Sequence, residues 1–175
     1  MQRLWATWRM EYITGTVENK NTDKDHCIFC SAPKIADDEE TLICHRGKHS
    51  FIIMNLYPYN NGHLMIIPYR HTSDITSLTD EESLEIMKFV KITTKVIKNL
   101  MNPEGFNIGM NVGRPGGAGI AEHLHMHVVP RWTGDNNFMP VLGDTRVISE
   151  HIEVTYKKIK DGIKALLESE SNLEG

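Results

Sequence analysis

Three histidines at alternate positions constrain the fold of this chain more than any other feature. The stretch EHLHMHVVPRW contains His123, His125 and His127. Residues two apart point to nearly opposite sides of a helix but share one face of a strand. The apolar residues between the histidines would then line the other face, against a core. We expect a strand with three imidazoles on one face, about 7 Å apart, that ends or becomes an edge at Pro130.

Length and composition exclude several classes of function. The 175 residues suffice for one domain with a substantial core, and the formal net charge of −4 offers no basic field for nucleic acid or anionic membranes. Any phosphate site must therefore be local. No apolar run reaches the roughly 20 residues of a membrane span, and Arg3, Arg9 and Glu11 interrupt any signal-peptide core. The odd number of cysteines favours a reducing cytoplasm over a disulfide framework.

Short strands between turns, with two amphipathic helices, predict an α+β domain on a largely antiparallel sheet. Strands are expected at 41–45, 49–55, 63–68 and 105–111 and in the histidine segment, after a polar loop at 16–26. A Thr79–Glu82 capping box opens one helix, which Asn102-Pro103 ends. Its apolar stripe comprises Ile86, Val90, Ile97 and Leu100. The second helix is expected at about 149–168 from apolar spacings of three and four.

The motif CIFC places Cys27 and Cys30 at the spacing of many zinc knuckles. Thioredoxin-like redox chemistry is an alternative, but no βαβ pattern surrounds the motif. Two buried, reduced thiols without a metal are another. A zinc site needs two more ligands, and histidine is preferred. The candidates are His71 and His123, with His26, His45 and His49 as rivals.

A glycine-rich loop, NVGRPGGAGIAEH, leads directly into the histidine segment. Glycines allow backbone N–H groups to approach a phosphate closely. The loop lacks the Gly-Lys-Ser/Thr ending of a P-loop and precedes a strand, not a helix. Its connection to three histidines nevertheless favours a local phosphate site.

Taken together, these segments resemble the histidine triad (HIT) superfamily. HLHMHVV resembles its His-x-His-x-His-x-x signature, and NLYPYNNGHLMIIPYRH is similar to its segment of Asn, Gly-His, strand and Pro-x-x-His. NVG and the small-residue loop lie upstream of the three histidines, where the family usually has such segments, and CIFC resembles the zinc pair of many bacterial members. The resemblance covers about residues 27–132. Beyond it, LWATWRMEYI and VVPRWTGDNNFMPVLGDTRVI resemble the branch that contains bacterial diadenosine tetraphosphate phosphorylases.

The resemblance implies a single domain over 1–175 with a five-stranded, mainly antiparallel sheet and two main helices. It implies that His125 attacks a nucleotide α-phosphorus, forming a nucleotidyl-histidine that a second acceptor resolves. It also implies that His127 donates a hydrogen bond to a phosphate or bridging oxygen, and that His63 supports the triad. The implied substrate contacts are Asn55, Asn111, Gly117, Ala118, Gly119, Ile120 and His127. The implied ligands of a structural zinc are Cys27, Cys30, His71 and His123, with no organic cofactor.

Several functions are compatible with this resemblance. We expect phosphorolysis of diadenosine tetraphosphate to ADP and ATP, with inorganic phosphate as co-substrate, in a homodimer whose sheet continues across the interface. The alternatives are hydrolysis of dinucleoside polyphosphates or nucleoside phosphoramidates, and a non-enzymatic nucleotide-binding or zinc-stabilised module. A uridylyltransferase fits less well, because that branch carries Gln at the position of His127. The chain departs from the family pattern at two places. A loop Gln or Ser is missing at Ala118-Gly119, which leaves the second acceptor open, and Tyr69 replaces a frequent Lys, which removes one cation.

Overall fold

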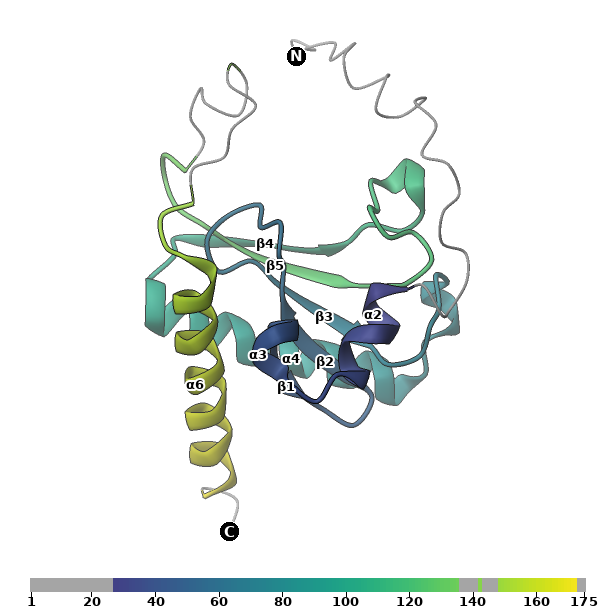
Figure 1. Cartoon of the computed structure of the whole chain (residues 1–175), viewed down its shortest axis with the longest axis horizontal. Coiled ribbons are helices and arrows are strands. Elements are labelled where there is room, and N and C mark those ends of the chain that lie inside the picture. The colour runs from purple at the N-terminus through teal and green to yellow at the C-terminus, as the bar shows by residue number, and fades with distance from the viewer. Residues whose placement is uncertain (1–26, 136–141, 143–147, 173–175) are drawn as a thin grey trace.

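The computed structural model describes residues 27–135, 142 and 148–172 (Figure 1). The predicted loop at 16–26, the rival ligand His26, and Trp5 and Trp8, which we expect to pack in the core, in the dimer or against a base, lie outside the described residues. Much of the C-terminal flanking resemblance does too.

Five strands form one antiparallel sheet in the order β1-β2-β3-β5-β4, which confirms the predicted fold class. The strands are β1 (Ile43–Arg46), β2 (Ser50–Met54), β3 (Leu64–Pro68), β4 (Gly105–Met110) and β5 (Met126–Arg131). Four of them lie close to the ranges predicted from short segments between turns. β4 lies at one edge of the sheet, and its middle residues are exposed.

Two long helices, α4 (Asp80–Met101) and α6 (Ile152–Ser171), pack together and against the sheet (Figure 1). The Thr79–Glu82 capping box opens α4 as predicted, and Asn102 ends it in a left-handed conformation with φ 47°. α6 begins three residues later than expected. Leu100, predicted on the buried stripe, is 44% exposed. It lies next to Gly162 of α6, which has no side chain to cover it.

Alternation along the strands divides the core into two clusters, one on each face of the sheet. The cluster between the sheet, α4 and α6 includes Ile52, Met54, Leu64, Ile66 and Val128. The cluster on the other face includes Phe51, Ile53, Met65 and Ile67 together with Cys27, Phe29 and Cys30. The last three belong to a turn around the short helix α2 (Ile28–Ser31), which sequence patterns did not predict. β2 and β3 are therefore buried on both faces.

The histidine segment is less regular than predicted. β5 begins at Met126, so His123 and His125 precede the strand and only His127 lies in it. Leu124 N–H donates to the carbonyl of Thr72 at 2.8 Å instead of joining a regular ladder. The imidazoles are accordingly closer than a ladder would place them, with 4.8 Å between the ring centroids of His125 and His127.

Pro130 does not end β5, but it lies where the strand becomes an edge, which is the second of the two predicted alternatives. The strand continues to Arg131, and Pro130 pairs with Phe106 of β4. Pairing of β5 with β3 stops at Val128, so at Pro130 the strand has one neighbour and its missing N–H disturbs no second ladder.

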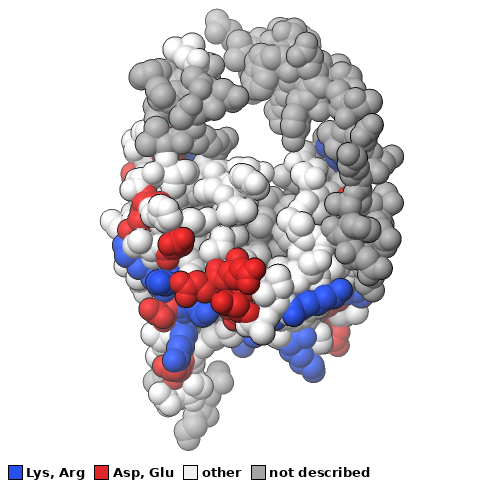
Figure 2. Space-filling view, viewed as in Figure 1, with Lys and Arg blue, Asp and Glu red and all other residues white. Residues whose placement is uncertain are grey.

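The remaining short elements are α3 (Asp38–Thr41), η2 (Ala32–Lys34), η3 (Ile75–Ser77) and η4 (Arg114–Gly116). In the part of the chain that the structure describes, no helix is both long and apolar enough to cross a membrane. On the face shown in Figure 2, Lys and Arg lie among Asp and Glu. Ion pairs of the described chain include Arg46–Asp38 and Lys157–Glu39. This mixed surface agrees with the expectation that any phosphate site is local.

Candidate active site and metal site

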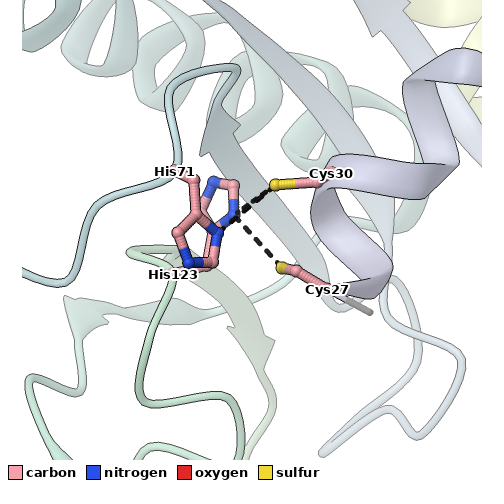
Figure 3. A group of neighbouring side chains, drawn as sticks. All are labelled: Cys27, Cys30, His71 and His123. Atoms are coloured by element: carbon pink, nitrogen blue, oxygen red, sulfur yellow. Dashed lines mark hydrogen bonds between the residues drawn. The ribbon is translucent and has the colours of Figure 1, made fainter. Parts of the chain in front are cut away.

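Four side chains from three distant segments converge on one point (Figure 3). Cys27 and Cys30 stand at the start and in the middle of the α2 turn, whose backbone closes with Cys30 N–H and Ser31 N–H donating to Cys27 O. His71 follows β3, and His123 lies in the connection before β5. The sulfur and nitrogen atoms of the four residues all lie within 4.8 Å of one another.

The spacing of these atoms fits a tetrahedral metal. Sulfur and nitrogen ligands at about 2.3 and 2.0 Å from zinc lie about 3.3–3.8 Å from each other. Cys27 Sγ is 3.4 Å from His123 Nδ1, and Cys30 Sγ is 3.3 Å from His71 Nδ1 and 3.6 Å from His123 Nδ1. Two cysteines with two histidines are a common donor set for structural zinc. The residues present can therefore hold such an ion.

The surroundings of His123 orient its ring for this cluster. Its Nε2–H donates to the carbonyl of Pro68 at 2.9 Å, which directs the lone pair of Nδ1 toward the two sulfurs. Burial lowers the pKa of His123 to about 4, so the ring is neutral at pH 7 and able to coordinate. Of the rival ligands, His45 packs against Phe89 of α4, and His49 lies outside the four-residue group.

His125 is held in one tautomer next to this cluster. Its Nδ1–H donates to the carbonyl of His123 at 2.9 Å, so Nε2 keeps its lone pair. The ring is only 5% exposed, and burial lowers the pKa of His125 below its ordinary value. A neutral imidazole in this tautomer can attack an electrophilic phosphorus through Nε2.

His63 and His127 form a directed hydrogen-bonded pair. Tyr59 N–H donates to His63 Nδ1 at 3.0 Å, and Asn55 Nδ2 is 3.3 Å from the same atom. His63 Nδ1 is therefore an acceptor, and the ring carries its proton on Nε2. His63 Nε2–H then donates to His127 Nδ1 at 2.9 Å. This order leaves the proton of a neutral His127 on Nε2.

The Nε2–H of His127 is buried and meets no acceptor among the described residues. Burial, together with nearby His125, lowers the pKa of His127 to about 4, which keeps the ring neutral at pH 7. A buried donor without an acceptor costs about 1–3 kcal/mol. Such a donor is typical of a site that receives its acceptor from a ligand.

The other predicted substrate residues hold the loops around the histidines. Asn55 accepts from Tyr57 N–H through Oδ1, which turns Nδ2 toward His63. Asn111 Nδ2 donates to the carbonyl of Gly117 at 3.4 Å. The amides of Gly117 and Ala118 already donate to Arg114 O and Gly113 O. Of the four loop residues predicted to supply backbone donors, Gly119 and Ile120 donate their amides to no acceptor in the described part of the chain, so the expected row of donors is shorter.

Two aromatic residues of the site were not expected from the sequence. Phe29 packs against His123 and His125, and Tyr59 packs against His63 and His127 with ring centroids 4.6 and 5.5 Å away. The sequence signals that could have identified them are the position of Phe29 within CIFC and the position of Tyr59 shortly before Gly62-His63. An aromatic residue beside a motif is more often a core residue, so the sequence alone did not assign either one.

A family model described as HIT domain matches residues 37–134. The chain is 44% identical over 158 residues to a Mycobacterium tuberculosis protein named AP-4-A phosphorylase. The matched region covers 89% of this chain and 80% of the relative. It is 30% identical over 105 residues to adenosine 5'-monophosphoramidase of Schizosaccharomyces pombe, covering 60% of this chain and 74% of the relative. A crystal structure of a hypothetical histidine triad nucleotide-binding protein from Sulfolobus tokodaii superposes with a TM-score of 0.66 and 28% identity, over 80% of this chain and 93% of that one.

Proposed function

The chain belongs to the HIT domain family, and on this premise we propose that it transfers a nucleotidyl group from diadenosine tetraphosphate to inorganic phosphate, giving ADP and ATP. The observation that carries the chemistry is the arrangement of His125 beside His127. One ring presents a lone pair on Nε2, and the other presents a buried N–H without an acceptor among the described residues. The 44% identity to an AP-4-A phosphorylase supports the choice of substrate.

The first step forms a covalent intermediate. Nε2 of His125 attacks the α-phosphorus, and the bond from phosphorus to the bridging oxygen breaks. His127 Nε2–H donates to the developing negative charge on the leaving oxygen, and ATP departs. His63 supports this role, because its hydrogen bond to His127 Nδ1 keeps the proton on Nε2.

The second step returns the enzyme to its starting state. An oxygen of inorganic phosphate attacks the adenylyl group on His125, the phosphorus–nitrogen bond breaks, and ADP leaves. In the glycine-rich loop, the amides of Gly119 and Ile120 are the candidate donors to phosphoryl oxygens. Asn111 contacts this loop at the carbonyl of Gly117, and Asn55 contacts His63. Arg114 lies 3.7 Å from Glu122, so part of its charge is already offset.

The four-residue cluster is proposed to hold a structural zinc. Four protein ligands close a tetrahedral site, so the ion would stabilise the turn around α2 and take no part in the bond changes. A zinc site with two thiolates also requires reduced cysteines, which supports a cytoplasmic location.

Labelled inorganic phosphate distinguishes phosphorolysis from hydrolysis. Because the acceptor oxygen of the second step comes from phosphate, we expect label in the β position of ADP and a rate that rises with phosphate concentration. Product analysis after incubation with diadenosine tetraphosphate gives the answer. Unlabelled AMP and ATP at a phosphate-independent rate would instead identify a hydrolase. Faster release of AMP from an adenosine phosphoramidate would favour the activity named for the S. pombe relative.

The edge strand β4 supports the proposal of a homodimer with a continuous sheet. Within the described chain β4 pairs only with β5, and Ile108 is 46% exposed on it. An exposed edge strand is a template for pairing with a second chain.

Ile108→Lys should therefore shift the protein from dimer to monomer in light scattering coupled to size exclusion. Val154→Lys is the matched control, because Val154 is also 46% exposed but lies on α6. An Ile108→Lys variant that keeps the molar mass of a dimer, or a wild-type protein that is monomeric, would contradict this interface.

A further inference from the structure

Phe29 occupies the middle of the turn between the two cysteines. Its side chain is 3% exposed, whereas its neighbour Ile28 is 60% exposed, so the turn directs Phe29 inward. The Phe29 ring centroid lies 5.2 Å from that of His125, with an interplanar angle of 53°. It lies 5.6 Å from the ring of His123 in an edge-to-face arrangement. One buried ring therefore touches both the candidate nucleophile and a candidate metal ligand.

The His125 ring is restrained in two directions by these neighbours. Its Nδ1–H is bonded to the carbonyl of His123, which fixes one edge of the ring. A single hydrogen bond still allows the ring to tilt about that contact. Phe29 packs against the ring from the α2 side and limits this tilt. The position of Phe29 depends in turn on the α2 turn, in which it lies between Cys27 and Cys30.

We propose that Phe29 is a positioning residue that holds the His125 ring in its attacking orientation. The turn that carries the two cysteines then acts on the chemistry through this one ring, in addition to its effect on stability. This proposal rests on the proposed role of His125 as nucleophile. Small misplacements of a reacting group have large effects, since about 1 Å can change a rate by roughly a hundredfold.

The test compares the same substitution at two positions of one core cluster. Phe29→Leu removes the ring beside His125 and keeps an apolar side chain. Phe51→Leu is the matched control, because Phe51 is fully buried in the same cluster but packs against Tyr69, 5.3 Å away. Both variants should lose comparable stability, and their rates are compared at equal metal content below both melting temperatures.

Phe29→Leu should lower kcat by about tenfold or more, with KM nearly unchanged. Phe51→Leu should keep kcat within about twofold of wild type. Equal kcat values for the two variants would overturn the proposal, because the loss would then reflect the weakened core alone.

A second readout does not depend on turnover. Nitrogen-15 NMR of the histidines at neutral pH reports which nitrogen of His125 carries the proton and whether the ring exchanges between environments. We expect one sharp Nδ1–H tautomer in wild type and Phe51→Leu, and a mixed or exchange-broadened signal in Phe29→Leu. Wild-type-like His125 signals in Phe29→Leu would overturn the proposal. If the wild-type protein turns over none of the nucleotides tested, the proposed function is contradicted. The NMR comparison would still decide whether Phe29 orders the His125 ring.

Discussion

Replacement of His125 by alanine should lower turnover of diadenosine tetraphosphate by about three orders of magnitude or more, a loss of roughly 4 kcal/mol of transition-state stabilisation. The reason is that His125 presents the lone pair of Nε2 in a fixed tautomer, whereas the Nδ1 lone pair of His63 already accepts from Tyr59 N–H. The measurement is the steady-state rate. As a direct check, the adenylyl-enzyme is trapped by denaturation without acid, because acid cleaves the phosphorus–nitrogen bond. A variant that keeps more than about a tenth of the rate, a loss below 1.4 kcal/mol, would rule out covalent catalysis by His125.

Burial of His125 requires a matched control for this experiment. The ring is 5% exposed and packs against Phe29, so alanine leaves a cavity and should also cost about 1–3 kcal/mol of stability. His125→Asn keeps a donor near the carbonyl of His123 but has no nitrogen lone pair for attack. It should be as inactive as alanine while more stable. Recovery of activity in His125→Gly by added imidazole would further separate chemistry from folding.

Loss of one cysteine ligand should have the second large effect, on stability. Cys27→Ser should lower the zinc content from about one ion per chain and reduce the melting temperature by about 10 °C, equivalent to roughly 4 kcal/mol for a chain of this length. The physical reason is that an ion bound only by the folded chain adds its binding free energy to folding. Calorimetry with and without a chelator, together with elemental analysis of untagged protein, measures both quantities.

The third cysteine provides the control for the metal experiment. Cys44 is 5% exposed but belongs to the cluster on the opposite face of the sheet, and burial raises the pKa of its thiol. Cys44→Ser should lower stability through a buried hydroxyl and leave the zinc content unchanged. The structural zinc would be refuted by Cys27→Ser protein that retains its full zinc content. Metal-free wild type, purified without chelators, that melts at the temperature of the loaded protein would refute it too.

Sequence patterns were sufficient for the sheet and the two long helices, because apolar runs between turns mark strands and apolar spacings of three and four mark helices. The short helix α2 was not predicted. The start of β5 could not be predicted in this way. Leu124 N–H bonds to Thr72, which is distant in the sequence, and that contact interrupts the alternation on which the prediction relied. Leu100 fits the helical period, but its exposure depends on Gly162 of another helix.

The candidate site shows the same division between local and distant information. Spacing alone nominated five histidines to accompany Cys27 and Cys30, and the family resemblance selected His71 and His123. The fold brings these two to the cysteines and places His45 against Phe89. The tautomers of His63 and His127 depend on the amide of Tyr59, a backbone group that no residue type reveals. The amides of Gly117 and Ala118 were expected to face a ligand, but the tight turn of the loop uses them itself.

His123 connects the cysteine cluster to the candidate nucleophile His125. Its ring lies in the cysteine cluster, and its backbone carbonyl accepts the hydrogen bond from His125 Nδ1–H. Zinc is spectroscopically silent, but cobalt in the same tetrahedral site absorbs visible light according to the geometry of its ligands. On the proposed mechanism, attachment of a nucleotidyl group to His125 changes the charge on that ring, which should pull on the carbonyl of His123 and slightly distort the geometry of a metal bound by the cluster. A cobalt-loaded protein would thus be a coloured reporter of its own covalent intermediate, read without any label on the nucleotide.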